Sequence, residues 1–343
     1  MNPTHEEHVR DLAITPDGDV VAAGRWDDRA SALMLDGATG QVLWEFQTND
    51  DYSELRCVVA LDDGSGDVLV AGWKDFDGLL ARLSPQGDVL WHRIINAGVA
   101  DNLDKILDLL LHPDGRVYAS GTLADRKAYA WLMADDPGQH QVYLNLPAAF
   151  PNGRRLEVAT PSALLIAGFS WGGYTQHGTV AMVNVNGPVQ WVHQAMDLNY
   201  AYGVAYTLDG ITVFVGPKDV AGPGLRAYVG ALDGQGNPLW EMADGVGDED
   251  SIYHGVCPAD PAGSNDVYVV GQVYEEIGGP SRQVLRRITS SGDVIWTVYG
   301  VDGIQDRNEW RAVTALDNGG VIVAGKQILV NDEADLVIER YDP

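Results

Sequence analysis

The chain has few cysteines, few basic residues and no long apolar run. Cys57 and Cys257 are its two cysteines, and neither has a partner at a disulfide-framework or zinc-ligand spacing, so both are expected to be buried thiols. Lys and Arg number 22 against 49 Asp and Glu, which gives a formal net charge of −27. Such a surface repels nucleic acid and anionic lipid, so neither is an expected partner. No apolar run approaches the roughly 20 residues of a membrane-spanning helix.

Targeting, metal and cofactor signals are also missing. Residues 1–8 are polar and contain no apolar core of a signal peptide, so a cytoplasmic location is expected. The acidic stretches 49–51 and 244–250 do not match a calcium-binding loop and are interpreted as solvated loops. The glycine-rich segment 168–173 lacks the lysine of a phosphate-binding loop. The sequence therefore predicts no metal site and no cofactor.

A short apolar run that ends in glycine is present in seven copies. The first copy is Val20 to Gly24, and the closing residues are Gly24, Gly72, Gly121, Gly168, Gly216, Gly271 and Gly325. Their intervals are 48, 49, 47, 48, 55 and 54 residues. A repeat of this length with β-rich content is typical of a propeller or a similar array.

Each repeat has the strand and turn signals of a four-stranded antiparallel sheet. In the first repeat, Pro16-Asp17-Gly18 forms a turn before the apolar run, and a second turn cluster precedes a strand that carries Trp44. An aromatic residue recurs on this fourth strand, as Trp44, Trp91, Tyr143, Trp191, Trp240 and Trp296. Because a tryptophan buries a large apolar area, these residues are expected to dock each blade against the next.

The predicted fold is an all-β, seven-bladed β-propeller of four-stranded antiparallel blades that form a single domain. The blades are expected at about 9–47, 55–94, 105–146, 154–194, 200–243, 251–299 and 309–343. The segment 101–111 resembles an amphipathic helix when it is read alone, but its register makes it the first strand of the third blade. The seventh repeat lacks a fourth strand, so the last blade is expected to have three strands and an outer edge that is a candidate for pairing with a partner.

The repeats resemble bacterial β-propeller repeat families, most clearly in the stretches 293–300 and 310–325. The segment 35–46 also resembles the tryptophan-docking motif of pyrroloquinoline-quinone-type repeats. That resemblance implies a propeller fold. Quinone enzymes of that type have eight blades and often adjacent cysteines, which this chain lacks, so no quinone cofactor is expected. The resemblance specifies the fold and says little about function.

A binding site is expected on the top face of the propeller, at the mouth of its central channel, because the loops there are long and uneven while the opposite turns are tight. Counting back from each turn places four arginines at one level of the innermost strands: Arg10, Arg56, Arg154 and Arg311. Leu107, Tyr202 and either Tyr253 or His254 belong to the same level, and Trp310 directly precedes its last arginine. Two residues earlier the chain has His8, Glu54, Lys105, Asn152, Tyr200 and Glu309.

Two functions follow from this level. The first is binding of an anionic small molecule or a protein partner, since arginine suits carboxylate and phosphate groups. The second is an enzyme of the lyase, isomerase or cyclase type acting on an anionic substrate, with acid–base candidates Glu54, Glu309, His8 and His254. The structural alternative is that each arginine pairs with a carboxylate and ties neighbouring blades together. No catalytic spacing is specific, so whether the protein is an enzyme stays open and binding is favoured.

Overall fold

The chain is described by a computed structural model over residues 7–49, 52–75, 77–95, 105–122, 130–133, 152–172, 175–185, 188–220, 224–246, 250–259, 265–274, 281–300, 308–328 and 334–342. Every regular element in these ranges is a β-strand. These ranges contain no helix that is long and apolar enough to cross a membrane. The chain divides into two compact units, Met1–Leu146 and Pro147–Pro343.

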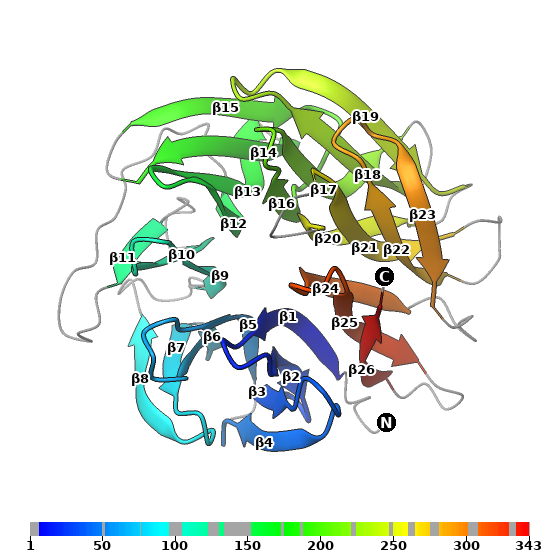
Figure 1. The fold of residues 1–343 in the computed structure, drawn as a ribbon. Helices are drawn as coiled ribbons and strands as arrows, with labels where there is room; N and C mark the ends of the chain where they lie inside the picture. Colours follow the sequence, from blue (N-terminus) through cyan, green and yellow to red (C-terminus); the bar gives the residue numbers. More distant parts are fainter. Residues whose placement is uncertain are drawn as a thin grey trace. The chain divides into compact units, whose positions relative to one another are not determined.

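The first unit contains three antiparallel sheets in which consecutive strands are neighbours (Figure 1). The first sheet consists of β1 (His8–Ile14), β2 (Val20–Trp26), β3 (Arg29–Leu35) and β4 (Val42–Gln47). The second consists of β5 (Ser53–Ala60), β6 (Val68–Lys74), β7 (Asp77–Leu83) and β8 (Val89–Ile95). The described part of the third consists of β9 (Lys105–Leu111), β10 (Val117–Thr122) and β11 (Ala130–Met133). The strand assignment of 101–111 is therefore confirmed over its described residues, and Tyr143 lies outside the described ranges.

The second unit contains four antiparallel sheets with the same strand order. They are β12 (Asn152–Thr160), β13 (Ala163–Gly172), β14 (Thr175–Asn184) and β15 (Val189–Ala195); then β16 (Gly203–Tyr206), β17 (Thr212–Asp219), β18 (Leu225–Leu232) and β19 (Pro238–Asp244). The next are β20 (Ile252–Pro258), β21 (Val267–Val273), β22 (Arg282–Ile288) and β23 (Val294–Tyr299). The last are β24 (Glu309–Ala315), β25 (Val321–Ile328) and β26 (Ala334–Tyr341). In the described ranges no strand pairs with the outer edge of β26, so the predicted three-stranded last blade is confirmed.

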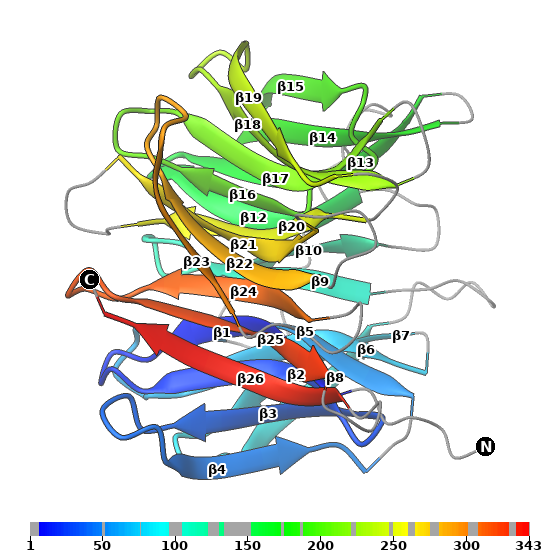
Figure 2. The ribbon, with the colours of Figure 1, turned by 90° about the vertical axis from the view of Figure 1, so that its right-hand side faces the viewer.

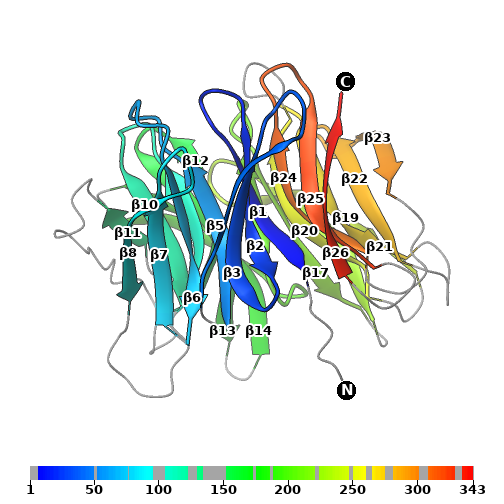
Figure 3. The same cartoon turned by 90° about the horizontal axis from the view of Figure 1, so that it is seen from below.

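Within each unit the sheets stack face to face, and the first strand of one sheet lies beside the first strand of the next. This is seen for β1 and β5 in Figure 3 and for β12, β16 and β20 in Figure 2. The apolar runs of the repeats form the second strands, which are buried on both faces, since the first five residues of β2 and of β6 are all buried. Stacked four-stranded meanders of this kind are propeller blades, so the predicted all-β propeller class is confirmed.

Three of the fourth-strand tryptophans, Trp44, Trp191 and Trp240, dock on the following sheet, as the sequence predicts. A Cβ atom on Gly87 would lie 2.9 Å from the Trp44 ring, and one on Gly292 would lie 2.9 Å from the Trp240 ring. The Trp240 indole N–H also donates to the Ser290 carbonyl at 2.7 Å. Each of these rings covers a turn that has no room for a side chain, and the contact fixes the spacing of the two sheets.

Candidate functional site

The repeated glycine lies beside an irregularity in the first strand of six of the seven sheets, whereas the described pairing of β16 with β17 is regular. A Cβ atom on Gly72 would lie 1.9 Å from the Glu54 carbonyl oxygen, and one on Gly325 would lie 2.0 Å from the Glu309 carbonyl oxygen. This close approach accompanies a β-bulge, where the register with the second strand skips one residue. The skipped residues are Arg10, Arg56, Leu107, Arg154, His254 and Arg311. The predicted arginine level is therefore a level of bulge residues, and a bulge re-aims its extra side chain.

In the first unit, Glu54 on β5 gathers donors from two sheets. Its Oε1 atom accepts hydrogen bonds from the guanidinium of Arg10 on β1 and from Arg56 Nη1 at 3.0 Å. The Nε2 atom of His8, also on β1, lies 2.9 Å from the same oxygen. Trp73 on β6 donates from its indole nitrogen to Oε2 at 3.1 Å. Glu54 thus ties β1 to β5 and holds two guanidiniums in place.

The surroundings of Glu54 keep it ionised. Burial alone would raise the pKa of this carboxyl, but Arg10, Arg56 and the hydrogen bond to His8 outweigh burial and hold its pKa well below the ordinary value of 4.5. Both arginines remain accessible to solvent, since the side chains of Arg10 and Arg56 are 20% and 19% exposed. Lys105 on β9 adds an ammonium group 4.6 Å above the Trp73 ring.

In the second unit, Glu309 on β24 occupies the same strand position as Glu54. Arg311 donates to Glu309 Oε1 from Nε at 2.7 Å and also from Nη2. Lys326 Nζ on β25 lies 3.4 Å from that oxygen. His254 Nε2 on β20 lies 2.9 Å from Oε2, in a close contact that is not an aligned hydrogen bond. The Arg311 side chain is 20% exposed, like its counterparts in the first unit.

A stack of rings extends this second cluster across three sheets. The His254 ring lies parallel to the Tyr202 ring, with centroids 5.7 Å apart, and Tyr202 stacks on Tyr200 at 5.6 Å. The Arg154 guanidinium lies 4.4 Å above Tyr202 and 5.2 Å from Tyr200. Burial raises the pKa of Tyr202 above its usual value, so its hydroxyl stays protonated. Residues from β12, β20 and the segment before β16 therefore form one continuous row.

Two of the predicted ligand-binding residues are core residues. Trp310 is fully buried and packs against Tyr341 at 5.8 Å. Tyr253 is also fully buried, and its hydroxyl donates to Asp244 Oδ2 at 2.7 Å. Each side chain directly precedes a bulge residue and points into the sheet packing, so neither belongs to an accessible site.

The structure thus brings the remaining predicted residues together in two groups. The first unit contains His8, Arg10, Glu54, Arg56 and Lys105, and the second contains Arg154, Tyr200, Tyr202, His254, Glu309 and Arg311. The sequence missed Trp73 and Lys326, which pair in register with the two glutamates. A signal was present, because both follow the repeated glycine directly. No cluster of three potential metal ligands occurs in the described ranges.

Comparison with known proteins supports the propeller fold and assigns the chain to no family. No protein family matches the chain, and no curated protein does. The chain is similar in structure to Chaetomium thermophilum Sqt1 bound to the N-terminus of ribosomal protein L10, with a TM-score of 0.59, 12% identity and 98% of both chains covered. It is also similar to Kluyveromyces lactis Hsv2, with a TM-score of 0.55, 10% identity, and 97% and 98% of the two chains covered. At this identity the likeness shows the fold alone.

Proposed function

We propose that this protein is a binding β-propeller that takes an anionic group, a carboxylate or a phosphate, at the arginines of its first-strand bulges. The observation that carries the proposal is the bulge itself. The same irregularity occurs in both units, and it presents Arg10 and Arg56 in the first unit and Arg154 and Arg311 in the second. Bulges are common beside functional sites because they re-aim a side chain out of the ladder.

The arginines are fixed in position yet still accessible. Glu54 and Glu309 are 5% exposed and hold the guanidiniums by hydrogen bonds, while about a fifth of the Arg56 and Arg311 side chains stays exposed. A guanidinium whose geometry is already set loses little entropy when a ligand binds. In a chain with net charge −27, cations grouped in this way are a local exception, which favours recognition of an anion over a general surface effect.

Binding is favoured over catalysis because of the state of the glutamates. A general base works best when its pKa lies near the working pH. The pKa of Glu54 is held well below its ordinary value by Arg10, Arg56 and His8, against the effect of burial. Its oxygens already accept from these groups and from Trp73. Glu54 is therefore a poor proton acceptor and a good positioning residue for the arginines.

The anion has two sources, a small molecule or an acidic segment of a protein partner. Sqt1, which shares the fold, has been seen with the N-terminus of a ribosomal protein bound. Isothermal titration with inorganic phosphate, succinate and a hexaglutamate peptide distinguishes these sources. A small-molecule site binds phosphate or succinate, whereas a protein-binding site binds only the peptide.

Arg56→Ala and Arg311→Ala are the informative variants. Each is expected to weaken binding of the preferred anion at least about tenfold, which is about 1.4 kcal/mol. Arg340→Ala is the matched control, because Arg340 is an exposed arginine on β26 that pairs with Asp342. If both variants lose thermal stability while the affinity for every anion stays unchanged, the arginines only tie the sheets together and the proposal fails.

A further inference from the structure

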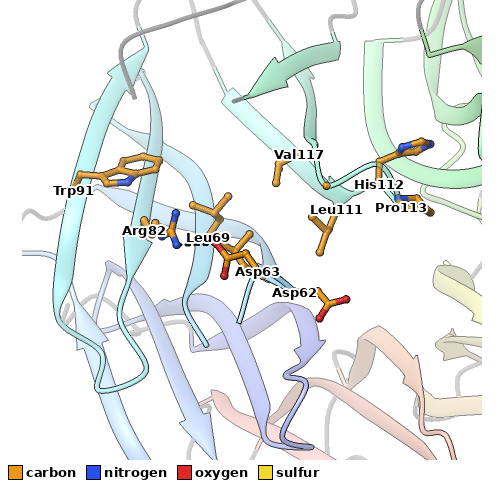
Figure 4. A pocket seen from close by; sticks show the side chains of 11 residues that line it. Asp62, Asp63, Leu69, Arg82, Trp91, Leu111, His112, Pro113 and Val117 are labelled. Atoms are coloured by element: carbon orange, nitrogen blue, oxygen red, sulfur yellow. Dashed lines mark hydrogen bonds and ion pairs between the residues drawn. The ribbon is translucent and has the colours of Figure 1, made fainter. Parts of the chain in front are cut away.

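A cavity of about 520 Å³ lies in the first unit, between the second sheet and the third (Figure 4). It opens at the end of the sheets where the first strand turns into the second, away from the bulges. Its apolar wall includes Leu61, Leu69, Trp91, Leu111 and Val117. A volume of this size is within the range of pockets that hold small molecules, roughly 300–1,000 Å³.

The polar side of the cavity is acidic. Arg82 donates from Nε to Asp67 Oδ2 at 2.6 Å and from Nη2 to Asp63 Oδ2 at 3.1 Å. Hydrogen bonds from the hydroxyl and the backbone N–H of Ser65 lower the pKa of Asp63, so this carboxyl is ionised at neutral pH. Asp62 is exposed at the same edge. Asp63 and Asp67 thus pair with the Arg82 guanidinium, while Asp62 lines the cavity with no ion pair to it among the described residues, so the edge of the cavity favours a positively charged ligand group.

The second unit contains a related arrangement, in which a tyrosine ring lies beside the tryptophan. Arg287 on β22 pairs with Asp266 through Nε at 2.9 Å, and it lies opposite Trp296 in register. Arg82 likewise lies opposite Trp91. The difference is the residue three positions before the repeated glycine, which is Tyr268 in the second unit and Leu69 in the first.

Tyr268 shows what the cavity would accept. Its ring is 1% exposed and packs against Trp296, and its hydroxyl donates to the Gly319 carbonyl at 3.1 Å. Gly319 is the turn glycine of the last sheet, with φ of 82°. The corresponding turn glycine in the first unit is Gly115, also with φ of 82°, and it lines the cavity. The space beside Leu69 thus corresponds to a place that a phenol ring fills in the second unit.

We infer that this cavity binds a cationic aromatic molecule, in which an aryl ring carries a hydrogen-bond donor at one end and an ammonium group at the other. The ring takes the place beside Trp91 that Tyr268 fills beside Trp296. The donor meets the carbonyl of the Gly115 turn, and the ammonium group lies at the acidic edge of Asp62 and Asp63. This site is separate from the anion site proposed above, because it differs in location, in wall chemistry and in the sign of its charge.

Tyramine is the probe that carries all three features. We expect tyramine to bind and to change the fluorescence of the protein, since Trp91 lines the cavity. Phenethylamine, which lacks the hydroxyl, is expected to bind about tenfold more weakly, and 4-hydroxyphenylacetate, which has the opposite charge, still more weakly.

Two variants test the location. Leu69→Tyr places the ring of Tyr268 in the cavity and is expected to reduce tyramine affinity at least about 20-fold while the melting temperature holds or rises. Leu208→Tyr is its control, because Leu208 is 68% exposed in the other unit. Asp62→Asn at the exposed edge is expected to weaken tyramine about fivefold and to leave phenol unaffected.

The inference is overturned if tyramine does not bind below about 10 mM. It is also overturned if tyramine binds equally to the wild type, Leu69→Tyr and Asp62→Asn, because binding then occurs elsewhere. Loss of phosphate or peptide binding in Arg56→Ala has no bearing on this outcome, so the two sites fail or stand independently.

Discussion

The glutamate clusters of the two units share one design. In each, a buried glutamate lies within the first two residues of the first strand of a sheet, as Glu54 in the first unit and Glu309 in the second. An arginine follows two residues later at the bulge, as Arg56 or Arg311, and hydrogen bonds to that glutamate. The two clusters therefore share a buried carboxylate and a partly exposed guanidinium two residues later on the same strand.

The two clusters differ in the other residues that lie near the glutamate. The bulge residue of the preceding sheet is Arg10 in the first unit and His254 in the second. The register partner of the glutamate is Trp73 in the first unit and Lys326 in the second. The residues around the glutamate thus differ between the two units, while the Glu–Arg pair is the same in both and is the geometry that the two clusters share.

The largest expected effect comes from the repeated glycine. Gly72→Ala places a Cβ atom 1.9 Å from the Glu54 carbonyl oxygen, so the bulge cannot persist. We expect a loss of about 3 kcal/mol or more in the free energy of unfolding, measured by urea denaturation. Gly325→Ala should cost a similar amount if the two clusters are equivalent. Gly234→Ala is the control, because nothing lies within 4 Å of its Cβ position; equal stability of all three variants would show that the bulges do not depend on glycine.

A smaller effect is expected from making the second unit like the first. Tyr268→Leu removes the ring that fills the space beside Trp296 and should cost about 2–3 kcal/mol in unfolding free energy, as other cavity-forming substitutions do. The variant should also gain a tyramine-binding cavity in the second unit. If calorimetry shows neither the loss nor a second tyramine site, the two spaces are not equivalent.

The smallest effect is the pH dependence of stability. The folded-state pKa of Glu54 is depressed, so its contribution is present above the unfolded value near 4.5 and is lost as the pH falls through the folded value. One such group changes the unfolding free energy by at most about 1.4 kcal/mol per pH unit. Glu54→Gln should therefore lower stability at pH 7 and flatten the decline below pH 4.5. Thermal melts at a series of pH values measure this decline in stability. If the variant declines as steeply as the wild type, the acid sensitivity comes from other groups.

The sequence predicted the fold well because the repeat fixes it. The period, the turn glycines and the fourth-strand tryptophans each have one physical role, and Trp44 and Trp240 dock as expected. The common level of Arg10 and Arg56 was also predictable, because both lie at the same position relative to a turn that recurs in the sequence.

The directions of side chains at that level could not be predicted. A bulge breaks the alternation of the strand, so the sequence pattern does not show which neighbour turns inward. Trp310 and Tyr253 were expected in the site and are core residues for this reason. The partners Trp73 and Lys326 were missed because they come from the second strand, whose register depends on the bulge.

The central claim is that the bulge arginines bind an anion, and ¹⁵N NMR of the arginine side chains tests it most directly. The Nε–H signals of Arg56 and Arg311, assigned by their loss in Arg56→Lys and Arg311→Lys, are followed during titration with phosphate and with hexaglutamate. We predict that both signals shift and saturate with one of these anions, while the signal of Arg340 stays in place. If the signals of Arg56 and Arg311 do not move at saturating concentrations of either anion, the account is contradicted.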